Sequence, residues 1–159
     1  MTRRSAGILA YRWKGLRLEV LLGHPGGPYW SRRDQGAWSI LKGEFQEGEN
    51  TESAARREFT EESGWTVAVP LEPLGEIRQR SGKIIIAYAA QADFDTATLS
   101  SNMFEIEWPP GSKKTQSFPE IDRADWFALA EAGMKIAPGQ AGFLDRLAVG
   151  AARPRAGGR

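Results

Sequence analysis

The sequence contains no cysteine and only one histidine, His24, among its 159 residues. The absence of cysteine excludes disulfide bonds, thiolate nucleophiles and cysteine-based metal sites. A single histidine likewise excludes a metal site built from several histidines. Any bound metal must therefore be held by oxygen ligands, which favours Mg²⁺, Mn²⁺ or Ca²⁺.

Long apolar runs are absent as well. The first run, residues 6–11, is bounded by Arg4 and Arg12 and is too short for a secretory signal core or a membrane span. With no other address visible, we expect a cytoplasmic protein. The formal net charge of +1 provides no argument for binding nucleic acid or a membrane, and nothing in the sequence indicates an oligomeric state.

The composition is that of one globular domain, with 41% hydrophobic and 26% charged residues. We expect this domain to cover residues 1–149. Residues 150–159 are small and basic, with nothing to bury, and a flexible tail is expected there.

The order of the predicted elements mixes strands and helices, which indicates an α/β sheet with helices packed on it. A hairpin is predicted around Lys14 and Gly15. One helix is expected at about residues 51–63, with Asn50 as its N-cap and Gly64 as its stop. The other expected elements are strands at 38–41, 74–80, 83–92 and 104–108 and helices at 129–134 and 140–149.

Three glutamates share one face of the helix expected at residues 51–63. At about 100° per residue, Glu62 and Glu61 fall about 40° and 60° to either side of Glu58. Phe59 and Ala55 lie beside them and are expected to bury against the sheet. Like charges at these spacings destabilise a helix by a few tenths of a kcal/mol each. A hard divalent cation reverses that repulsion.

Three glutamates by themselves also fit a solvated acidic helix face. The residues around them favour a cation site instead. Arg57 is placed to pair with Glu61 at i+4, and Glu49 is placed to hold the arginine from the other side. Two glycines, Gly43 and Gly64, bracket the segment.

Residues 43–65 resemble the Nudix box, Gly-x5-Glu-x7-Arg-Glu-U-x-Glu-Glu-x-Gly-U, in which U is a bulky apolar residue. Every specified position is filled, by Gly43, Glu49, Arg57, Glu58, Phe59, Glu61, Glu62, Gly64 and Trp65. Residues 38–43 resemble the family's entry strand, although Leu41 stands where many relatives have proline. The resemblance implies an α/β fold, an αβα sandwich with a mixed β-sheet.

The resemblance also implies a metal-dependent active site. Glu58, Glu61 and Glu62 would bind Mg²⁺ or Mn²⁺, together with the carbonyl of Gly43. Arg57 and Glu49 would orient this group. Such a site suits a pyrophosphate, whose charge must be neutralised and whose attacking water must be oriented.

The general base is left open by the sequence. Family members use either a box glutamate, here Glu58, or a glutamate from a distant loop. The candidates outside the box are Glu105, Glu107 and Glu120. Strand alternation puts Glu105 and Glu107 on one face, opposite Phe104 and Ile106. We take Glu107 as the outside candidate, with an exposed strand residue as the alternative.

Substrate contacts are expected from residues before the box, which combine aromatic rings with cations. The predicted contacts are Arg32, Arg33, Trp38 and Lys42. His24 could touch a phosphate, but a turn histidine without a catalytic role is the simpler interpretation. The proline typical of ADP-ribose enzymes and the tyrosine typical of many dinucleoside-polyphosphate enzymes are both absent near Arg80, and neither absence excludes those substrates.

The function implied is hydrolysis of a phosphoanhydride bond in a nucleoside diphosphate linked to another group, such as a nucleoside triphosphate or a dinucleoside polyphosphate. The alternative is a Nudix-fold module that senses a nucleotide or binds a partner without hydrolysis. A third possibility is a domain with a structural Ca²⁺. Intact Glu58, Glu61, Glu62 and Arg57 favour the enzyme, because modules without activity commonly lose these residues.

Overall fold

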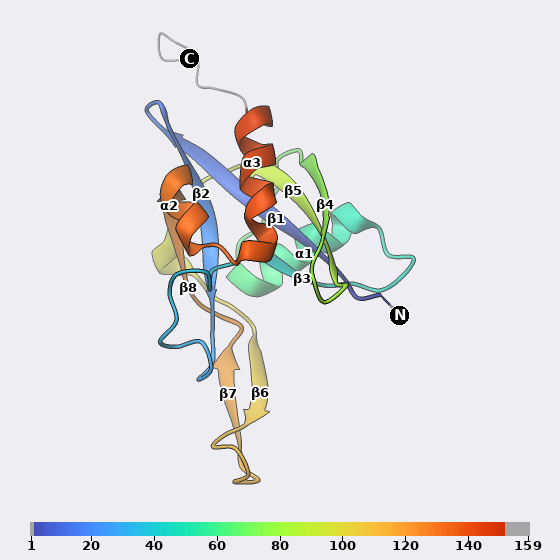
Figure 1. Ribbon diagram of the computed structural model, residues 1–159, viewed down its shortest axis with the longest axis vertical. Coiled ribbons are helices and arrows are strands. Elements are labelled where there is room, and N and C mark those ends of the chain that lie inside the picture. Colours follow the sequence, from blue (N-terminus) through green and yellow to red (C-terminus); the bar gives the residue numbers. More distant parts are fainter. Residues whose placement is uncertain (1, 152–159) are drawn as a thin grey trace.

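The computed structural model describes residues 2–151. Its helices and strands are mixed along the chain, as the sequence predicts (Figure 1). The strands are β1 (Arg4–Lys14), β2 (Arg17–Pro25), β3 (Leu41–Glu44), β4 (Glu72–Arg78), β5 (Ile84–Gln91), β6 (Met103–Glu107), β7 (Thr115–Pro119) and β8 (Ile121–Ala128). The helices are α1 (Thr51–Ser63), α2 (Leu129–Lys135) and α3 (Ala141–Gly150), with short 3-10 turns at Thr96–Thr98 and Pro138–Gln140.

The main sheet has the strand order β4-β5-β1-β2-β8, with β3 paired to β1 beside β2. It is mixed, because β1 runs parallel to β5 and antiparallel to β2 and β3. The predicted β1–β2 hairpin is confirmed, and Gly15 supplies the positive φ of 61° that its tight turn requires. Since β2 and β3 share one side of β1, the sheet splits between them.

Helices cover both faces of this sheet, so the predicted αβα sandwich is confirmed. One core lies between the sheet and α1 and includes Ile8, Leu41 and Phe59. The other lies between the opposite face and helices α2 and α3, and includes Phe143 and Leu147. Figure 1 shows α2 and α3 in front of the sheet and α1 behind it.

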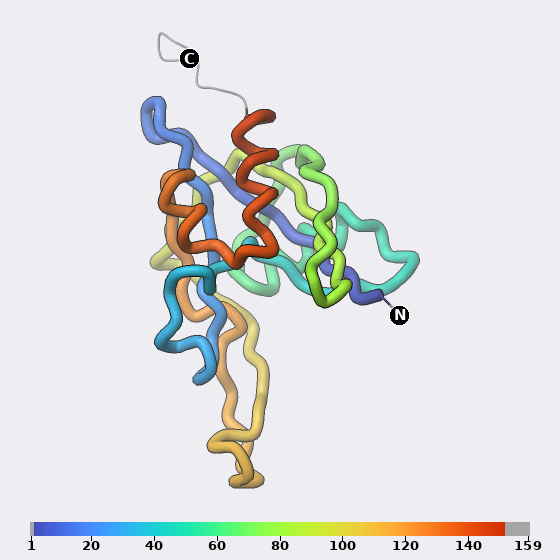
Figure 2. Tube along the Cα trace, in the orientation of Figure 1, coloured from blue at the N-terminus to red at the C-terminus, as the bar shows by residue number. Residues whose placement is uncertain are grey.

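A second, two-stranded sheet projects from this body. Strands β6 and β7 pair antiparallel, with Glu107 opposite Thr115 (Figures 1 and 2). The sequence predicts β6 and its alternation, and the structure confirms both. Strand β7 is missed, because its exposed Thr115, Gln116 and Ser117 offer no apolar periodicity to detect it by.

The end of the chain is only partly described. Helix α3 runs one residue beyond the expected end, to Gly150, and Ala151 packs against the core. The predicted flexible tail therefore begins inside an ordered element, and its remaining residues, 152–159, lie outside the described residues. None of the helices within residues 2–151 has the length and apolar character needed to span a membrane.

Candidate metal and active site

Helix α1 presents the acidic face, and its ends form as the sequence predicts. The side chain of Asn50 accepts a hydrogen bond from the Ser53 N–H at 2.9 Å. Gly64 closes the helix in the left-handed conformation, with φ of 80°. These caps set the start of the helix and hence the direction in which each of its glutamates points.

The helix buries its apolar side and two of its carboxylates. Phe59 and Ala55 are fully buried, which confirms the expected packing against the sheet. Glu58 and Glu62 are also buried, with exposed fractions of 8% and 9%, whereas Glu61 remains exposed. Burial of two carboxylates on one helix face is costly, which makes this face a candidate functional site.

Strand β3 crosses these carboxylates with its backbone. The Lys42 N–H donates a hydrogen bond to Glu62 Oε1 at 3.0 Å. A Cβ placed on Gly43 would lie 1.8 Å from Glu58 Oε2, so only glycine allows this approach. The strand thus brings the Gly43 backbone directly against Glu58.

Arg57 contacts three of the surrounding glutamates. Its guanidinium donates to Glu49 Oε2 at 2.9 Å and to Glu58 Oε1 at 2.8 Å, and it reaches Glu61 Oε1 at 3.4 Å. The predicted pairing of Arg57 with both Glu49 and Glu61 is confirmed. The bond to Glu58 was not predicted, because Glu58 is the adjacent residue and sequence spacing alone does not show its side chain turning toward Arg57.

The carboxylates perturb one another. Burial raises the pKa of Glu62 to about 8, with the charges of Glu120 and Glu58 adding to it and Lys42 opposing it. Burial, then the charge of Glu61, raises the pKa of Glu58, while Arg57 lowers it. Within residues 2–151, no three acidic or histidine side chains converge closely enough to hold an ion as they stand. Their oxygen chemistry nevertheless fits a hard divalent cation.

Glu120 joins this group from the other end of the chain. It follows β7, and its N–H bonds to the Asn102 carbonyl at 2.9 Å, while the Asn102 N–H bonds to the Glu61 carbonyl at 2.9 Å. Burial and the charge of Glu61 raise the pKa of Glu120. The base of the β6–β7 hairpin is therefore docked on the C-terminal end of α1, next to the acidic face.

Glu107 lies elsewhere. Its carboxylate accepts hydrogen bonds from the Gly111 N–H at 3.2 Å and the Lys113 N–H at 2.9 Å, in the turn of its own hairpin. The turn is at the free end of the hairpin, away from α1 (Figure 1). Of the outside glutamates, the structure thus brings Glu120, and not Glu107, to the box.

The structure corrects one of the expected substrate contacts, Trp38, and leaves two others, Arg32 and Arg33, apart from the carboxylates. Trp38 is 3% exposed, packs edge-on against Phe127 and donates its ring N–H to Asp34, so it belongs to the core and cannot stack on a base. Arg32 and Arg33 are exposed in the loop after β2, and Arg33 lies over the Trp30 ring. His24 is buried between Asp122 and the Arg33 carbonyl, in agreement with a structural role.

A family model, described as NUDIX domain, matches residues 1–147. The chain belongs to the Nudix family. A search of curated protein sequences gave no match.

Solved structures agree with this Nudix fold. The chain is similar to the NUDIX domain of Shewanella oneidensis NrtR complexed with ADP ribose, at 15% identity and a TM-score of 0.66, over 94% of this chain and 88% of that one. It is also similar to a C. elegans Ap4A hydrolase, at 21% identity and a TM-score of 0.62, over 91% and 96%. A MutT protein from Methanosarcina mazei Go1 matches at 22% identity and a TM-score of 0.61, over 93% and 94%. At these identities the likeness shows the fold alone.

Proposed function

We propose that this Nudix domain is a hydrolase that uses Mg²⁺ or Mn²⁺ to split a phosphoanhydride bond in a small nucleotide. The observation that carries the proposal is the buried carboxylate pair, Glu58 and Glu62, held against the backbone of Lys42 and Gly43. Burial raises the pKa of both carboxylates in spite of their bonds to Arg57 and the Lys42 N–H, and a bound cation would supply the opposite charge that favours their ionised forms.

The ion would be held by Glu58, Glu61, Glu62 and the Gly43 carbonyl. When bound, it would neutralise phosphate charge and orient the attacking water. Arg57 would keep Glu58 in place, since it already bonds to that carboxylate and is itself held by Glu49.

The proton of the attacking water needs an acceptor. Hydrolysis forms a new P–O bond to this water and breaks the bridging P–O bond, with the proton passing to a carboxylate. Glu58 is engaged by Arg57, whereas Glu120 has no side-chain hydrogen bond or ion pair within residues 2–151. We therefore assign the base to Glu120 in place of Glu107, and Glu58 is the competing candidate.

The substrate class is supported by what the similar structures are named for. One is a complex with ADP ribose and another is an Ap4A hydrolase, and both molecules contain phosphoanhydride bonds next to adenosine. We propose the same class here: a nucleoside diphosphate linked to another moiety.

The test is turnover of nucleoside triphosphates, dinucleoside polyphosphates and nucleotide sugars with Mg²⁺ or Mn²⁺. Glu58→Gln should lower turnover by two orders of magnitude or more, about 3 kcal/mol of barrier. Glu105→Gln, an exposed glutamate on β6, is the matched control and should stay within a few-fold of wild type. Binding of these nucleotides without any metal-dependent turnover would identify a non-catalytic module instead, and full activity in Glu58→Gln would reject the mechanism.

A further inference from the structure

Three cations gather at one end of the sheet, beside the carboxylates but outside the box helix. We call this group, Arg3, Lys42 and Lys83, the cationic edge. Arg3 and Lys83 immediately precede the parallel strands β1 and β5, where the Ile84 N–H bonds to the Arg3 carbonyl at 2.9 Å. Lys42 stands opposite Gly7, on β3.

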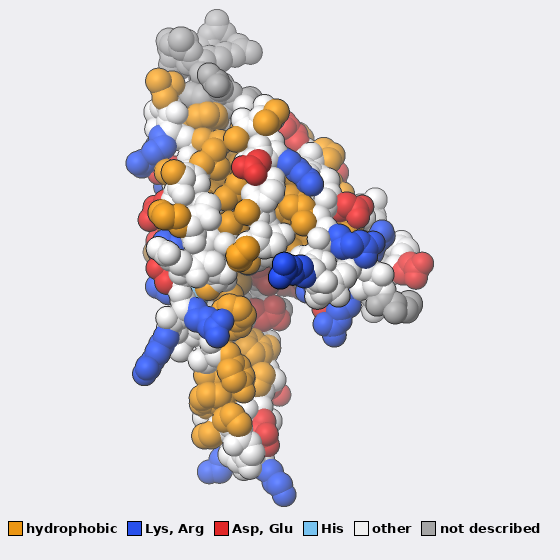
Figure 3. All heavy atoms as spheres, viewed as in Figure 1, with side chains coloured by type: hydrophobic (Ala, Val, Ile, Leu, Met, Phe, Trp, Pro, Cys, Tyr) orange, Lys and Arg blue, Asp and Glu red, His pale blue; other side chains and the backbone are white. Residues whose placement is uncertain are grey.

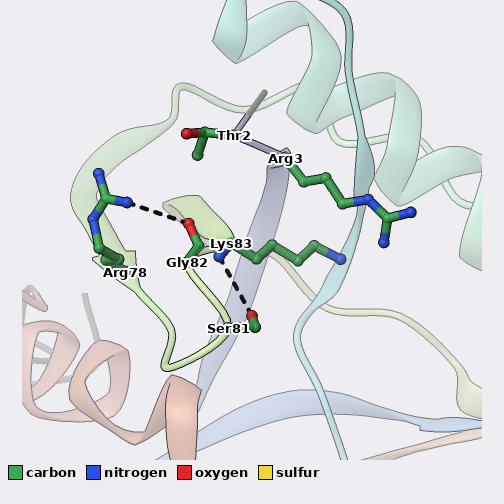
Figure 4. A pocket seen from close by; sticks show the side chains of 6 residues that line it. All are labelled: Thr2, Arg3, Arg78, Ser81, Gly82 and Lys83. Carbon is green, nitrogen blue, oxygen red and sulfur yellow. Dashed lines mark hydrogen bonds between the residues drawn. The ribbon is translucent and has the colours of Figure 1, made fainter.

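The pairing register puts the three side chains on one face of the sheet. Ser5 stands opposite both Ile85 and Glu44. Side chains two residues apart on a strand point the same way. Arg3 lies two residues before Ser5, Lys83 two before Ile85, and Lys42 two before Glu44. The side chains of Arg3, Lys83 and Lys42 therefore share one face of the sheet. Figure 4 shows the Arg3 and Lys83 side chains extending in the same direction, while Arg78 points away from them.

Open space surrounds this edge. A hollow of about 510 Å³ is lined by Arg3, Lys83 and the turn between β4 and β5. A second, of about 730 Å³, is lined by Arg3, Arg4 and residues 44–47 of the box loop. Thr2 and Arg3 line both hollows, and the second hollow borders the box loop.

The cations on this surface are poorly neutralised. Arg3 and Lys42 form no side-chain ion pair within residues 2–151, and Lys83 reaches only Glu44, at 3.8 Å. By contrast, Arg12 on β1 pairs with both Glu19 and Asp93 at 2.9 Å. An anion placed between these groups would relieve their mutual repulsion.

Lys42 connects the cationic edge to the carboxylates. Its N–H bonds to Glu62 from the side of β3 that faces away from β1, and within the described chain β3 pairs only with β1. A ligand at this open side of β3 can contact Glu62 and the Lys42 side chain together. The charge of Lys42 interacts with those of Glu58 and Glu62 and also with that of Lys83. A diphosphate held at the carboxylates would therefore end near Lys42, and a longer chain of phosphates would continue toward Lys83 and Arg3.

We propose that the cationic edge binds the outer phosphates of a nucleotide carrying at least three consecutive phosphates, and so selects polyphosphate substrates over two-phosphate ones. The inference rests on the proposed function and adds the substrate class. Arginine suits this role because its guanidinium grips two phosphate oxygens at once, and lysine adds a point charge.

The test removes the two cations of this group that lie outside β3 and the box helix, Arg3 and Lys83. In Arg3→Gln/Lys83→Gln, KM should rise about tenfold or more for a nucleoside triphosphate and a dinucleoside tetraphosphate, and stay within about twofold for ADP-ribose. Lys113→Gln/Lys114→Gln, in the exposed β6–β7 turn, removes the same charge and should change neither KM. An equal rise for both substrate types, an equal effect in this control, or unchanged KM values would overturn the inference.

A binding measurement separates this inference from the proposed function. Inorganic tripolyphosphate, titrated by calorimetry in metal-free buffer, should bind about tenfold more weakly to Arg3→Gln/Lys83→Gln than to wild type or the control. If wild type hydrolyses no nucleotide but this difference is found, the proposed function fails and the anion site stands. If turnover is normal and tripolyphosphate binds all three proteins equally, the anion site fails and the hydrolase stands.

Discussion

Helix α1 and the β6–β7 hairpin both carry closely spaced glutamates, but the two regions differ in how far they bury them. Glu58 and Glu62 are buried under β3, and burial raises the pKa of each. Glu105 and Glu107 are exposed on the hairpin, and Glu107 is satisfied by the amides of its own turn. The comparison teaches that a run of carboxylates becomes a candidate cation site only when a second element removes water from it.

The largest effect should come from breaking the contact between β3 and α1. In Gly43→Ala, the new Cβ would lie 1.8 Å from Glu58 Oε2, and the carboxylate must move. We expect turnover to fall by about two orders of magnitude, roughly 3 kcal/mol of barrier, with only a small loss of stability, because the displaced group is the end of a flexible side chain.

Gly133→Ala is the control for this substitution, since a Cβ on that α2 glycine meets nothing within 4 Å. It should leave turnover unchanged and stabilise the helix by up to about 1 kcal/mol. Equal turnover in the two glycine variants would show that the close approach at Gly43 has no role in activity.

The next effect compares Glu120 with Glu107, both outside the box. Glu120→Gln should lower kcat by about 100-fold, in the range of a lost general base, and leave the affinity for Mg²⁺ unchanged. Glu107→Gln should stay within a few-fold of wild type. Steady-state kinetics across a metal titration measures both quantities. A large loss in Glu107→Gln with none in Glu120→Gln would reverse the assignment.

A smaller effect should appear in stability. Mg²⁺ at ten times its Kd should stabilise the folded protein by about 1.4 kcal/mol, and so raise Tm by roughly 3–6 °C. Glu62→Gln should lose most of this shift, while Glu105→Gln on the hairpin should keep it. Thermal unfolding with and without Mg²⁺ measures the difference. The same shift in both variants would locate metal binding outside the box.

The smallest effect concerns pH in metal-free protein. Because the folded state raises the pKa of Glu62 from 4.5 to about 8, the folded state holds this proton more tightly than the unfolded state. Stability should therefore fall as pH rises from about 4.5 to about 8 and level off above it. Urea unfolding at pH 6 and pH 8.5 should differ by on the order of 1 kcal/mol. Glu62→Gln should reduce this difference in unfolding free energy. If the difference is the same in Glu62→Gln and wild type, other titrating groups cause it.

The sequence was a good guide wherever the information is local. The bounds of α1, its two caps, the burial of Phe59 and Ala55 and the pairing of Arg57 with Glu49 and Glu61 were all predicted and are confirmed. Each depends on residues within a few turns of one another, so helical periodicity and capping chemistry are sufficient.

Errors and omissions involve contacts between distant parts of the chain. Trp38 lies near several arginines in the sequence, a combination that suggests a base-binding site. In the structure its ring packs against Phe127 instead. The sequence favours Glu107 as the outside glutamate, whereas hydrogen bonds that join Glu61, Asn102 and Glu120 bring Glu120 to the box instead.

The sequence by itself determined that any metal site must use oxygen ligands, that three glutamates share a helix face, and that the chain carries a complete Nudix box. Only the tertiary structure decided that β3 covers Glu58 and Glu62, that Glu120 joins them, and that Arg3 and Lys83 line one hollow. The reason is physical: periodicity orients side chains on one element, whereas burial and charge coupling depend on which elements pack together.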